Sequence, residues 1–408
     1  MLDHSLLNLR ILVVGPILWF ATDVLATNRY YSDITASSPN GRYTVEAKSP
    51  DNASGDEHHA FQDKFLYTCI DTHTDETLWT RHQPMEAPST APNGDLEDYE
   101  FPEEGSPSSI YVSDTAWTVI RTGWDEIISV DRHGNDRGPL HLLSEAFTEE
   151  ERDRYVHDTT AGPMWAGNSL WYFLNVEDKH VFVIRPWWGK RIFIGLEECR
   201  LLKEADSLTS TAANQENQFV MTTLKESSKL TKSSQKQDCC SSNAGSTLAA
   251  HLAGTLKVKQ AVPLLRTLED SSYSGSSVMC LDDDLPPAIA NWREMTLRKA
   301  VHLSLRRLGQ KPSEYPCNTF AALPASMMPT QAPRADGVVK LEKGMRPNAV
   351  ISHIGSPDYI DRSVWYFDID AEDPYTLELS WGKAGVDRFK KITPPLWTTD
   401  KWDEELAY

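Results

Sequence analysis

The sequence predicts a multi-domain chain with an all-β N-terminal domain, an α-helical segment and a small α+β C-terminal domain. Apolar residues alternate in short runs up to about residue 204 and then recur at helical spacing as far as residue 311. A capped helix and three strand-like runs follow between residues 337 and 397. At 408 residues the chain can hold two or three hydrophobic cores, since single domains usually have about 100 to 200 residues.

The composition is acidic, with 59 acidic against 40 basic side chains and a formal net charge of −19. This charge favours solubility and weakens any general attraction to nucleic acid or to anionic lipid. We therefore expect another protein as the partner, with an envelope protein as one option, and no nucleic acid. A cytoplasmic nucleic-acid binder stays open as a third alternative because of one basic helical segment near residue 300.

Residues 1–26 have the features of a signal peptide or membrane anchor. Arg10 precedes an apolar run over 11–20, and the short side chains of Val24 and Ala26 suit a signal peptidase. The run is shorter than the roughly 20 apolar residues of a typical spanning helix, so cleavage and retention as an anchor both stay open. We expect an exported, periplasmic or envelope-associated protein that touches the membrane only through this segment. A buried N-terminal strand or helix is the alternative.

Residues 27–204 show the pattern of short strands separated by turns. A Pro-Asn-Gly turn at 38–41 precedes apolar residues at period two, and the runs 170–175 and 180–185 form a hairpin. The Ser-Pro-Asn-Gly-Arg-Tyr and Val-Asp-Arg-His-Gly-Asn segments resemble pieces of β-propeller blades. They lack a clean repeat of about 40 residues, so a sandwich or a partial propeller-like sheet is expected.

Helical spacing begins in residues 205–245, which combine one amphipathic helix with a low-complexity linker. Within residues 246–311, two segments form a helical hairpin, and a third carries an apolar stripe of Leu297, Val301, Leu305 and Leu308. The Ala-Val-Pro-Leu-Leu and Leu-Arg-x-Ala elements resemble HEAT-like repeats, which stack antiparallel helix pairs and usually bind proteins. The resemblance implies an exposed helical-repeat surface.

A Pro-rich linker over 312–336 leads to the small α+β domain at 337–397. Pro347 suits a first helical turn and Gly355 a left-handed cap, and strand-like runs follow at 363–368, 376–381 and 388–392. The order of a Gly-Met pair, a helix, an Ile-Gly-x-Pro turn and a Trp strand resembles the SmpA/OmlA-type small envelope-lipoprotein domain. The matching residues are Gly344, Met345, Ile354, Gly355, Pro357 and Trp365.

The sequence contains no Gly-x-Ser-x-Gly elbow, no Gly-rich phosphate loop ending in Lys-Ser/Thr and no His-Glu-x-x-His. We therefore expect no catalytic residue, no cofactor and no metal site. Partner binding is expected through the basic helix and the face of the C-terminal sheet. The contact candidates are Arg298, Arg306, Arg307, Trp365, Tyr366 and Trp381.

These features together predict a non-catalytic, envelope-associated protein-interaction or scaffold protein. The alternative is a secreted hydrolase that acts on an envelope polymer through carboxylates near the Trp-rich β region. Two carboxyl groups about 5 to 10 Å apart in a cleft would favour the hydrolase. An exposed concave helical face would favour the scaffold.

Overall fold

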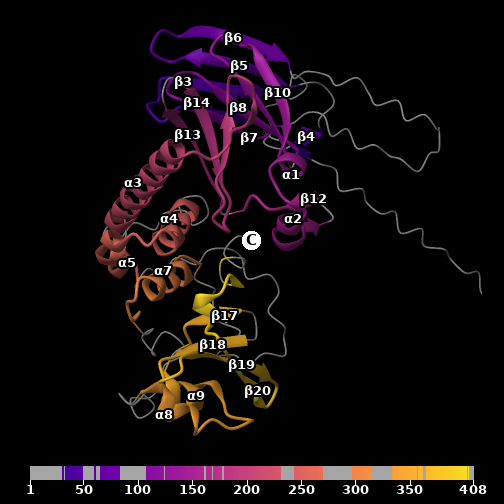
Figure 1. The fold of residues 1–408 in the computed structure, drawn as a ribbon. Coiled ribbons are helices and arrows are strands. Elements are labelled where there is room, and N and C mark those ends of the chain that lie inside the picture. The colour runs from indigo at the N-terminus through magenta and orange to yellow at the C-terminus, as the bar shows by residue number, and fades with distance from the viewer. Residues whose placement is uncertain are drawn as a thin grey trace, which may run out of the picture.

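A computed structural model gives the fold (Figure 1). It describes residues 30–31, 33–48, 59–60, 65–82, 107–123, 125–159, 162–167, 169–176, 179–230, 243–269, 296–313, 333–355, 357–361, 364–401 and 403. The expected signal segment 1–26 lies outside these ranges. The low-complexity stretch 231–242 and residues 314–332 of the expected linker also lie outside them.

Four-stranded antiparallel sheets dominate the described structure, and each joins strands that follow one another along the chain. The first sheet contains β2 (Ile34–Ser37), β3 (Tyr43–Lys48), β5 (Leu66–Asp71) and β6 (Glu76–His82). The second sheet contains β7 (Pro107–Val112), β8 (Thr118–Thr122), β9 (Glu126–Val130) and β10 (Asp136–His141). The third sheet contains β13 (Leu170–Val176), β14 (Lys179–Arg185), β15 (Ile192–Gly195) and β16 (Arg200–Leu201).

Shorter elements flank these sheets. Two strand pairs are formed by β1 (Tyr30–Tyr31) with β4 (His59–Ala60) and by β11 (His157–Thr159) with β12 (Gly162–Met164). Helix α1 (Leu142–Glu145) precedes α2 (Glu149–Tyr155). Helix α2 begins at a complete capping box, in which Thr148 and Glu151 each bind the other's backbone N–H.

The three N-terminal sheets pack face to face, and strands β8 and β14 of the second and third sheets are buried on both sides. In β8, Val119 packs towards the third sheet, whereas its neighbour Ile120 packs towards the first. In β14, Phe182 packs towards the second sheet, whereas Val181 and Val183 turn the other way and pack against helices. Successive side chains of a strand point to opposite faces, so two-sided burial needs a near-continuous apolar run.

Helices cover the outer face of the third sheet. They are α3 (Asp206–Leu230), α4 (Asn243–Thr255), α5 (Val262–Leu268) and α7 (Thr296–Arg307), and a single 3-10 turn, Lys259–Ala261, precedes α5. The predicted stripe on α7 is confirmed for Leu297, Val301 and Leu305, which are buried, whereas Leu308 is half-buried and follows the end of α7. Gly254 lies inside α4, where a Cβ would come within 2.7 Å of the Ser304 Cα. The small residue therefore serves the close crossing of α4 with α7.

The C-terminal sheet contains β17 (Tyr359–Asp361), β18 (Val364–Ile369), β19 (Tyr375–Gly382) and β20 (Gly385–Ile392), and a 3-10 turn, Leu396–Thr398, follows it. Helices α8 (Arg334–Val338) and α9 (Pro347–Ile354) precede it. Pro347 stands in the first turn of α9, as predicted. Gly355 has the expected positive φ of 77°, but its ψ of −166° is not that of a left-handed helical cap.

Side chains of β18 reach two separate cores. Tyr366 faces α7 and belongs to the core shared with the third sheet, whereas Trp365 and Phe367 face α8 and α9. Figure 1 shows the resulting order, with the N-terminal sheets at one end, helices α3 to α7 in the middle and the C-terminal sheet at the other end. The prediction of a chain built from several β-sheets and helices is confirmed at this level.

Candidate functional site

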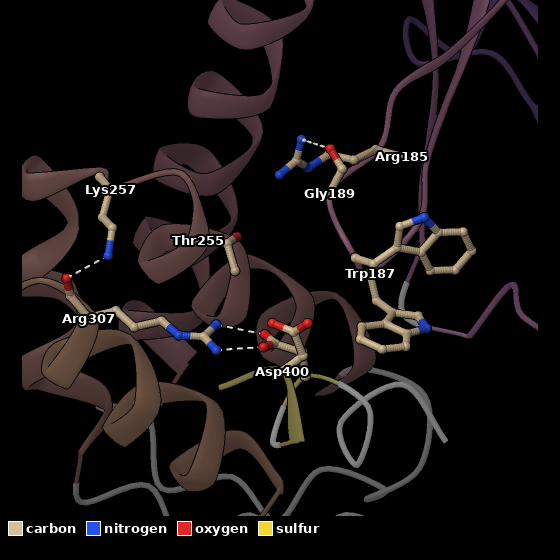
Figure 2. A pocket seen from close by; sticks show the side chains of 9 residues that line it. Arg185, Trp187, Gly189, Thr255, Lys257, Arg307 and Asp400 are labelled. Carbon is tan, nitrogen blue, oxygen red and sulfur yellow. Dashed lines mark hydrogen bonds and ion pairs between the residues drawn. The ribbon is translucent and has the colours of Figure 1, made fainter. Parts of the chain in front are cut away.

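A polar groove lies where the third sheet, the helices and the C-terminal segment meet (Figure 2), and we call it the junction groove. Its volume is about 300 Å³, and its lining residues are Arg185, Trp187, Trp188, Gly189, Thr255, Lys257, Arg307, Asp400 and Asp403. A second hollow of about 530 Å³ shares Trp188 and Gly189 with it and is lined on its far side by residues of α2. A ligand in the junction groove would therefore contact several distant parts of the chain at once.

The loop 186–190 follows directly from β14 and carries the two tryptophans. Gly189 has a φ of 91°, which favours glycine, and its N–H donates to the Pro186 carbonyl at 3.0 Å to close a tight turn. Trp188 stacks on Tyr155 with ring centroids 4.8 Å apart and planes 9° apart, while Trp187 meets the same ring edge-on. The turn therefore places an aromatic ridge, formed by Tyr155, Trp187 and Trp188, beside the groove.

A buried ion cluster fastens the third sheet to α3 next to this ridge. Glu216 is 0% exposed and accepts hydrogen bonds from Arg191 Nε, Arg191 Nη2 and the Tyr172 hydroxyl, each at 2.8 Å. Arg185 is more distant, with its Nη1 3.6 Å from Glu216 Oε2, and this Nη1 donates to the Gly189 carbonyl at 3.2 Å. Burial lowers the pKa of Arg185, Glu216 opposes that change, and the charge of Arg191 adds to it. The cluster therefore holds two guanidinium groups against one carboxylate.

Across the groove, Arg307 at the end of α7 is paired with Asp403. Its Nη1 and Nη2 donate to the two carboxylate oxygens at 2.6 and 2.5 Å, which is the strong bidentate geometry. His251 lies with Nε2 2.7 Å from the same carboxylate, but its ring direction does not make a hydrogen bond. Burial lowers the pKa of His251 to about 4 despite the attraction of Asp403. At neutral pH an uncharged His251 therefore packs beside a closed ion pair.

Lys257, Thr255 and Asp400, which also line the groove, have partners in the chain. Lys257 Nζ donates to the Arg307 carbonyl at 2.9 Å, and the Thr255 hydroxyl donates to a carbonyl of its own helix at 3.3 Å. Arg154 Nη2 donates to Asp400 at 2.8 Å. Among the described lining residues, no hydroxyl or thiol is hydrogen-bonded to a general base, which is the arrangement that nucleophilic catalysis uses. The groove offers fixed charges and aromatic walls, which suit binding.

A second buried polar network joins α7 to the C-terminal sheet. Asp358 pairs with Arg334 and accepts a hydrogen bond from the Asp368 backbone N–H at 2.7 Å, and Arg306 Nε lies 3.5 Å from Asp368 Oδ2. Burial and the negative charge of Asp358 raise the pKa of Asp368 well above its ordinary value. Burial opposes ionisation of Asp358 too, but the Arg334 guanidinium holds the pKa of Asp358 below its ordinary value. The surroundings therefore favour ionisation of Asp358 and oppose ionisation of Asp368.

Two of the three basic residues that were predicted to contact a partner form ion pairs within the chain. Arg306 donates to Asp370 at 2.6 Å and lies over the Trp397 ring at 5.0 Å. Arg307 lines the junction groove with its guanidinium closed on an aspartate. Arg298 belongs to α7, but its side chain lies outside the described residues. Arg306 and Arg307 of the basic helix therefore pair with acidic residues that follow the helix in the chain.

The three predicted aromatic contacts lie in the cores. Trp365, Tyr366 and Trp381 are 0%, 3% and 7% exposed, and the two indoles pack edge to face at 4.7 Å. Their burial follows from the covering of the C-terminal sheet on both faces, by α7 on one side and by α8 and α9 on the other. A partner could touch these side chains only after a rearrangement, and a contact role for them stays a prediction.

Within the described residues, no group of three or more His, Cys, Asp or Glu side chains is placed to hold a metal ion. None of the described helices combines the length and the apolar character needed to cross a bilayer. Cys69 and Cys199 are buried free thiols, and burial raises the pKa of both. These two thiols are therefore protonated and act as core residues.

Sequence reasoning named Arg307 on one side of the groove but missed Arg185 on the other side and the buried Glu216 beside it. Arg185 follows Val181 and Val183 at period two, which places it on the face of β14 that packs against helices. Glu216 interrupts an i, i+4 series of apolar residues on α3 that includes Ala212 and Val220. A charged residue within a buried stripe needs a partner of opposite charge. The apolar pattern around Arg185 and Glu216 could therefore have indicated that these two residues form a buried ion pair.

In comparisons with known proteins, no family model, no curated protein and no solved structure matches this chain.

Proposed function

We propose that this protein is a non-catalytic, envelope-associated interaction protein that binds another protein at the junction groove. In this proposal an all-β N-terminal domain, a HEAT-like helical segment and a small α+β C-terminal domain act together as one scaffold. The export of the chain rests on the signal-like residues 1–26. The HEAT-like and envelope-lipoprotein resemblances are part of the same proposal.

The observation that carries the proposal is the composite lining of the junction groove. Its side chains come from β14 and its following loop, from α4 and the turn after it, from α7 and from residues 400–403. Buried ion pairs on both sides, Glu216 with Arg191 and Arg307 with Asp403, hold these parts in place. A groove fixed in this way loses little conformational freedom when a partner binds, which favours affinity.

The packing of the helices also favours the groove, and not a concave helical surface, as the binding site. The apolar faces of α4 and α7 lie between the third sheet and the C-terminal sheet, in one core with Tyr359 and Tyr366. Their buried faces are therefore already used within the chain. The charged and aromatic side chains that line the groove, among them the exposed Lys257, are better placed to meet a partner, and aromatic and arginine side chains are enriched at such contacts.

Site-specific crosslinking in cells tests the proposal. A photoreactive amino acid replaces Lys257, which lines the groove, or Lys259, an exposed lysine two residues away that does not line it. After irradiation, the envelope and soluble fractions are separated and the adducts are identified by mass spectrometry. We expect a single protein adduct in the envelope fraction from position 257 and none from position 259.

Three results would contradict the proposal. Equal adducts from both positions would mean that the groove is not the contact. Absence of adducts, together with release of soluble fragments from an envelope polymer by the purified protein, would favour the hydrolase. A full-length chain beginning with Met1 in the soluble cytosolic fraction would overturn the location.

A further inference from the structure

The wall of the junction groove formed by Arg185, Trp187 and Trp188 is rich in hydrogen-bond donors and poor in acceptors. Three N–H groups on it make no hydrogen bond: Arg185 Nε, Trp187 Nε1 and Trp188 Nε1. All three atoms are covered from solvent, and Arg185 as a whole is only 7% exposed. Buried donors without acceptors are rare in folded proteins, because each one loses its bond to water without replacement. Such a wall is chemically complementary to a ligand that accepts hydrogen bonds.

The positive charge of Arg185 also favours a ligand that accepts hydrogen bonds. The bidentate bond from Arg191 and the hydroxyl of Tyr172 already occupy Glu216. The exposed Glu204 acts on Arg191, and among the described residues Glu216 is the one carboxylate that raises the pKa of Arg185. Arg185 is therefore a buried cation that shares its counter-ion with a better-placed neighbour. Buried charges are normally paired, so an anion is the missing component.

The acids of the groove do not supply that component. Asp403 is held by the two Nη atoms of Arg307, and Asp400 by Arg154. Figure 2 shows Arg185 on the side of the strand and loop, with Lys257 and Arg307 on the side of the helices. Lys257 is exposed and adds a second cation at the groove. The surplus charge therefore lies at Arg185 and Lys257, on opposite sides of the space.

Size and shape favour a short peptide as the carrier of the anion. The groove of about 300 Å³ is at the lower end of ligand pockets, and the second hollow of about 530 Å³ continues beyond Trp188. The Tyr155 and Trp188 rings stack between the two hollows and offer a flat surface for backbone or apolar side chains. A guanidinium with a vacant Nε and Nη2 edge matches the planar geometry of a carboxylate.

We propose that the junction groove binds a peptide through a carboxylate that Arg185 holds, with Lys257 adding positive charge across the groove and the peptide chain lying along Trp188 and Tyr155. The carboxylate is either the C-terminus of the partner or an Asp or Glu side chain near an exposed end. This inference rests on the proposed interaction function and names the chemistry of the partner at the same site. Small movements of the tryptophan and arginine side chains would bring the covered N–H groups to the ligand.

Fluorescence anisotropy with the purified full chain tests this inference. The probes are three fluorescein-labelled peptides: Gly-Ala-Phe-Ala-Ala with a free C-terminus, the same peptide as an amide, and a Gly-Glu-Phe-Ala-Ala amide. We expect binding of the free acid, of the Glu amide or of both, and no binding of the neutral amide. Binding of the free acid alone assigns the C-terminus, and binding of the Glu amide alone assigns a side-chain carboxylate.

Matched variants connect binding to the named side chains. We expect Arg185→Gln to weaken binding by roughly tenfold or more, because a charged hydrogen bond is lost. Lys257→Gln, at an exposed position, weakens it several-fold without affecting folding, whereas Lys259→Gln leaves it unchanged. Arg185→Lys keeps the charge but loses the planar fork, so it recovers only part of the affinity.

Several outcomes would overturn the inference. They are equal binding of the amide and acid peptides, unchanged affinity in both Arg185→Gln and Lys257→Gln, and binding of inorganic phosphate without binding of any peptide. None of these outcomes depends on the crosslinking result. An envelope adduct at position 257 with no peptide binding would leave the interaction function in place and remove only the carboxylate.

Discussion

Replacing Glu216 with Gln should destabilise the protein far more than replacing Arg185. Glu216 is 0% exposed and is the shared counter-ion of two guanidinium groups, with hydrogen bonds of 2.8 Å from Arg191 and a separation of 3.6 Å from Arg185. Removing its charge leaves both cations buried without compensation. Breaking a buried pair by removing one partner costs about 3 to 5 kcal/mol.

Arg185→Gln is the matched control, because it removes a buried cation and leaves Glu216 fully bonded by Arg191 and Tyr172. We expect it to change the free energy of unfolding by less than about 1 kcal/mol, since the lost attraction is offset by the relief of burying a charge. Arg191→Gln, in contrast, breaks the bidentate bond and should lose a similar amount to Glu216→Gln.

Urea unfolding followed by tryptophan fluorescence measures these differences. With a denaturant slope of about 3 kcal/mol per M, a loss of 3 to 5 kcal/mol moves the midpoint down by about 1 to 1.5 M. A loss below about 1 kcal/mol for Glu216→Gln would refute the buried-cluster reasoning. So would an equal loss for Arg185→Gln, because Arg185 would then be a full partner of the carboxylate and not a surplus cation.

The two networks that flank α7 and the crossing of α4 with α7 give three further predictions. Burial lowers the pKa of His251 to about 4 from an ordinary value of about 6.5, so the unfolded chain binds a proton that the folded chain does not. Stability is therefore full above about pH 6.5 and falls by about 3 kcal/mol towards pH 4, and urea titrations of His251→Asn should lack this part of the fall. Asp368→Asn imitates a protonated carboxyl and should change stability by less than about 1 kcal/mol, whereas Asp358→Asn leaves Arg334 without its carboxylate and should cost about 3 kcal/mol. Equal losses in thermal melts would contradict the view that Asp358 is the ionised carboxylate of the pair. Gly254→Ala puts a Cβ 2.7 Å from a backbone atom of α7 and should cost about 1 to 3 kcal/mol, whereas Gly245→Ala, with no atom within 4 Å, should not destabilise, as urea midpoints will show.

Local periodicity predicted the elements that repeat a simple pattern. The stripe on α7 follows the helical period, and the strands β18, β19 and β20 lie within a few residues of their predicted bounds. The one amphipathic helix predicted within residues 205–245 is α3, which begins at Asp206. Its first half is mostly polar, and its buried apolar side chains are Leu208 and Ala212, which form a narrow stripe that overall composition does not reveal.

The candidate site could not be predicted because its partners are distant in the sequence. Arg307 meets Asp403 and Arg185 meets Glu216 only after the helices pack between two sheets. The aromatic contacts proposed on the C-terminal sheet failed to reach the surface for a related reason. Strand β18 is apolar on both faces, and that pattern indicates covering on two sides without naming what covers it.

Photocrosslinking from position 257 in an Arg185→Gln background tests the central claim most directly, because it examines the groove, its partner and its surplus cation together. We predict one envelope-protein adduct from the otherwise unchanged chain and an adduct yield reduced roughly tenfold by Arg185→Gln, with position 259 giving none. The same adduct at undiminished yield in the variant would contradict recognition through Arg185. No specific adduct from position 257 in either chain would contradict the junction groove as the binding site.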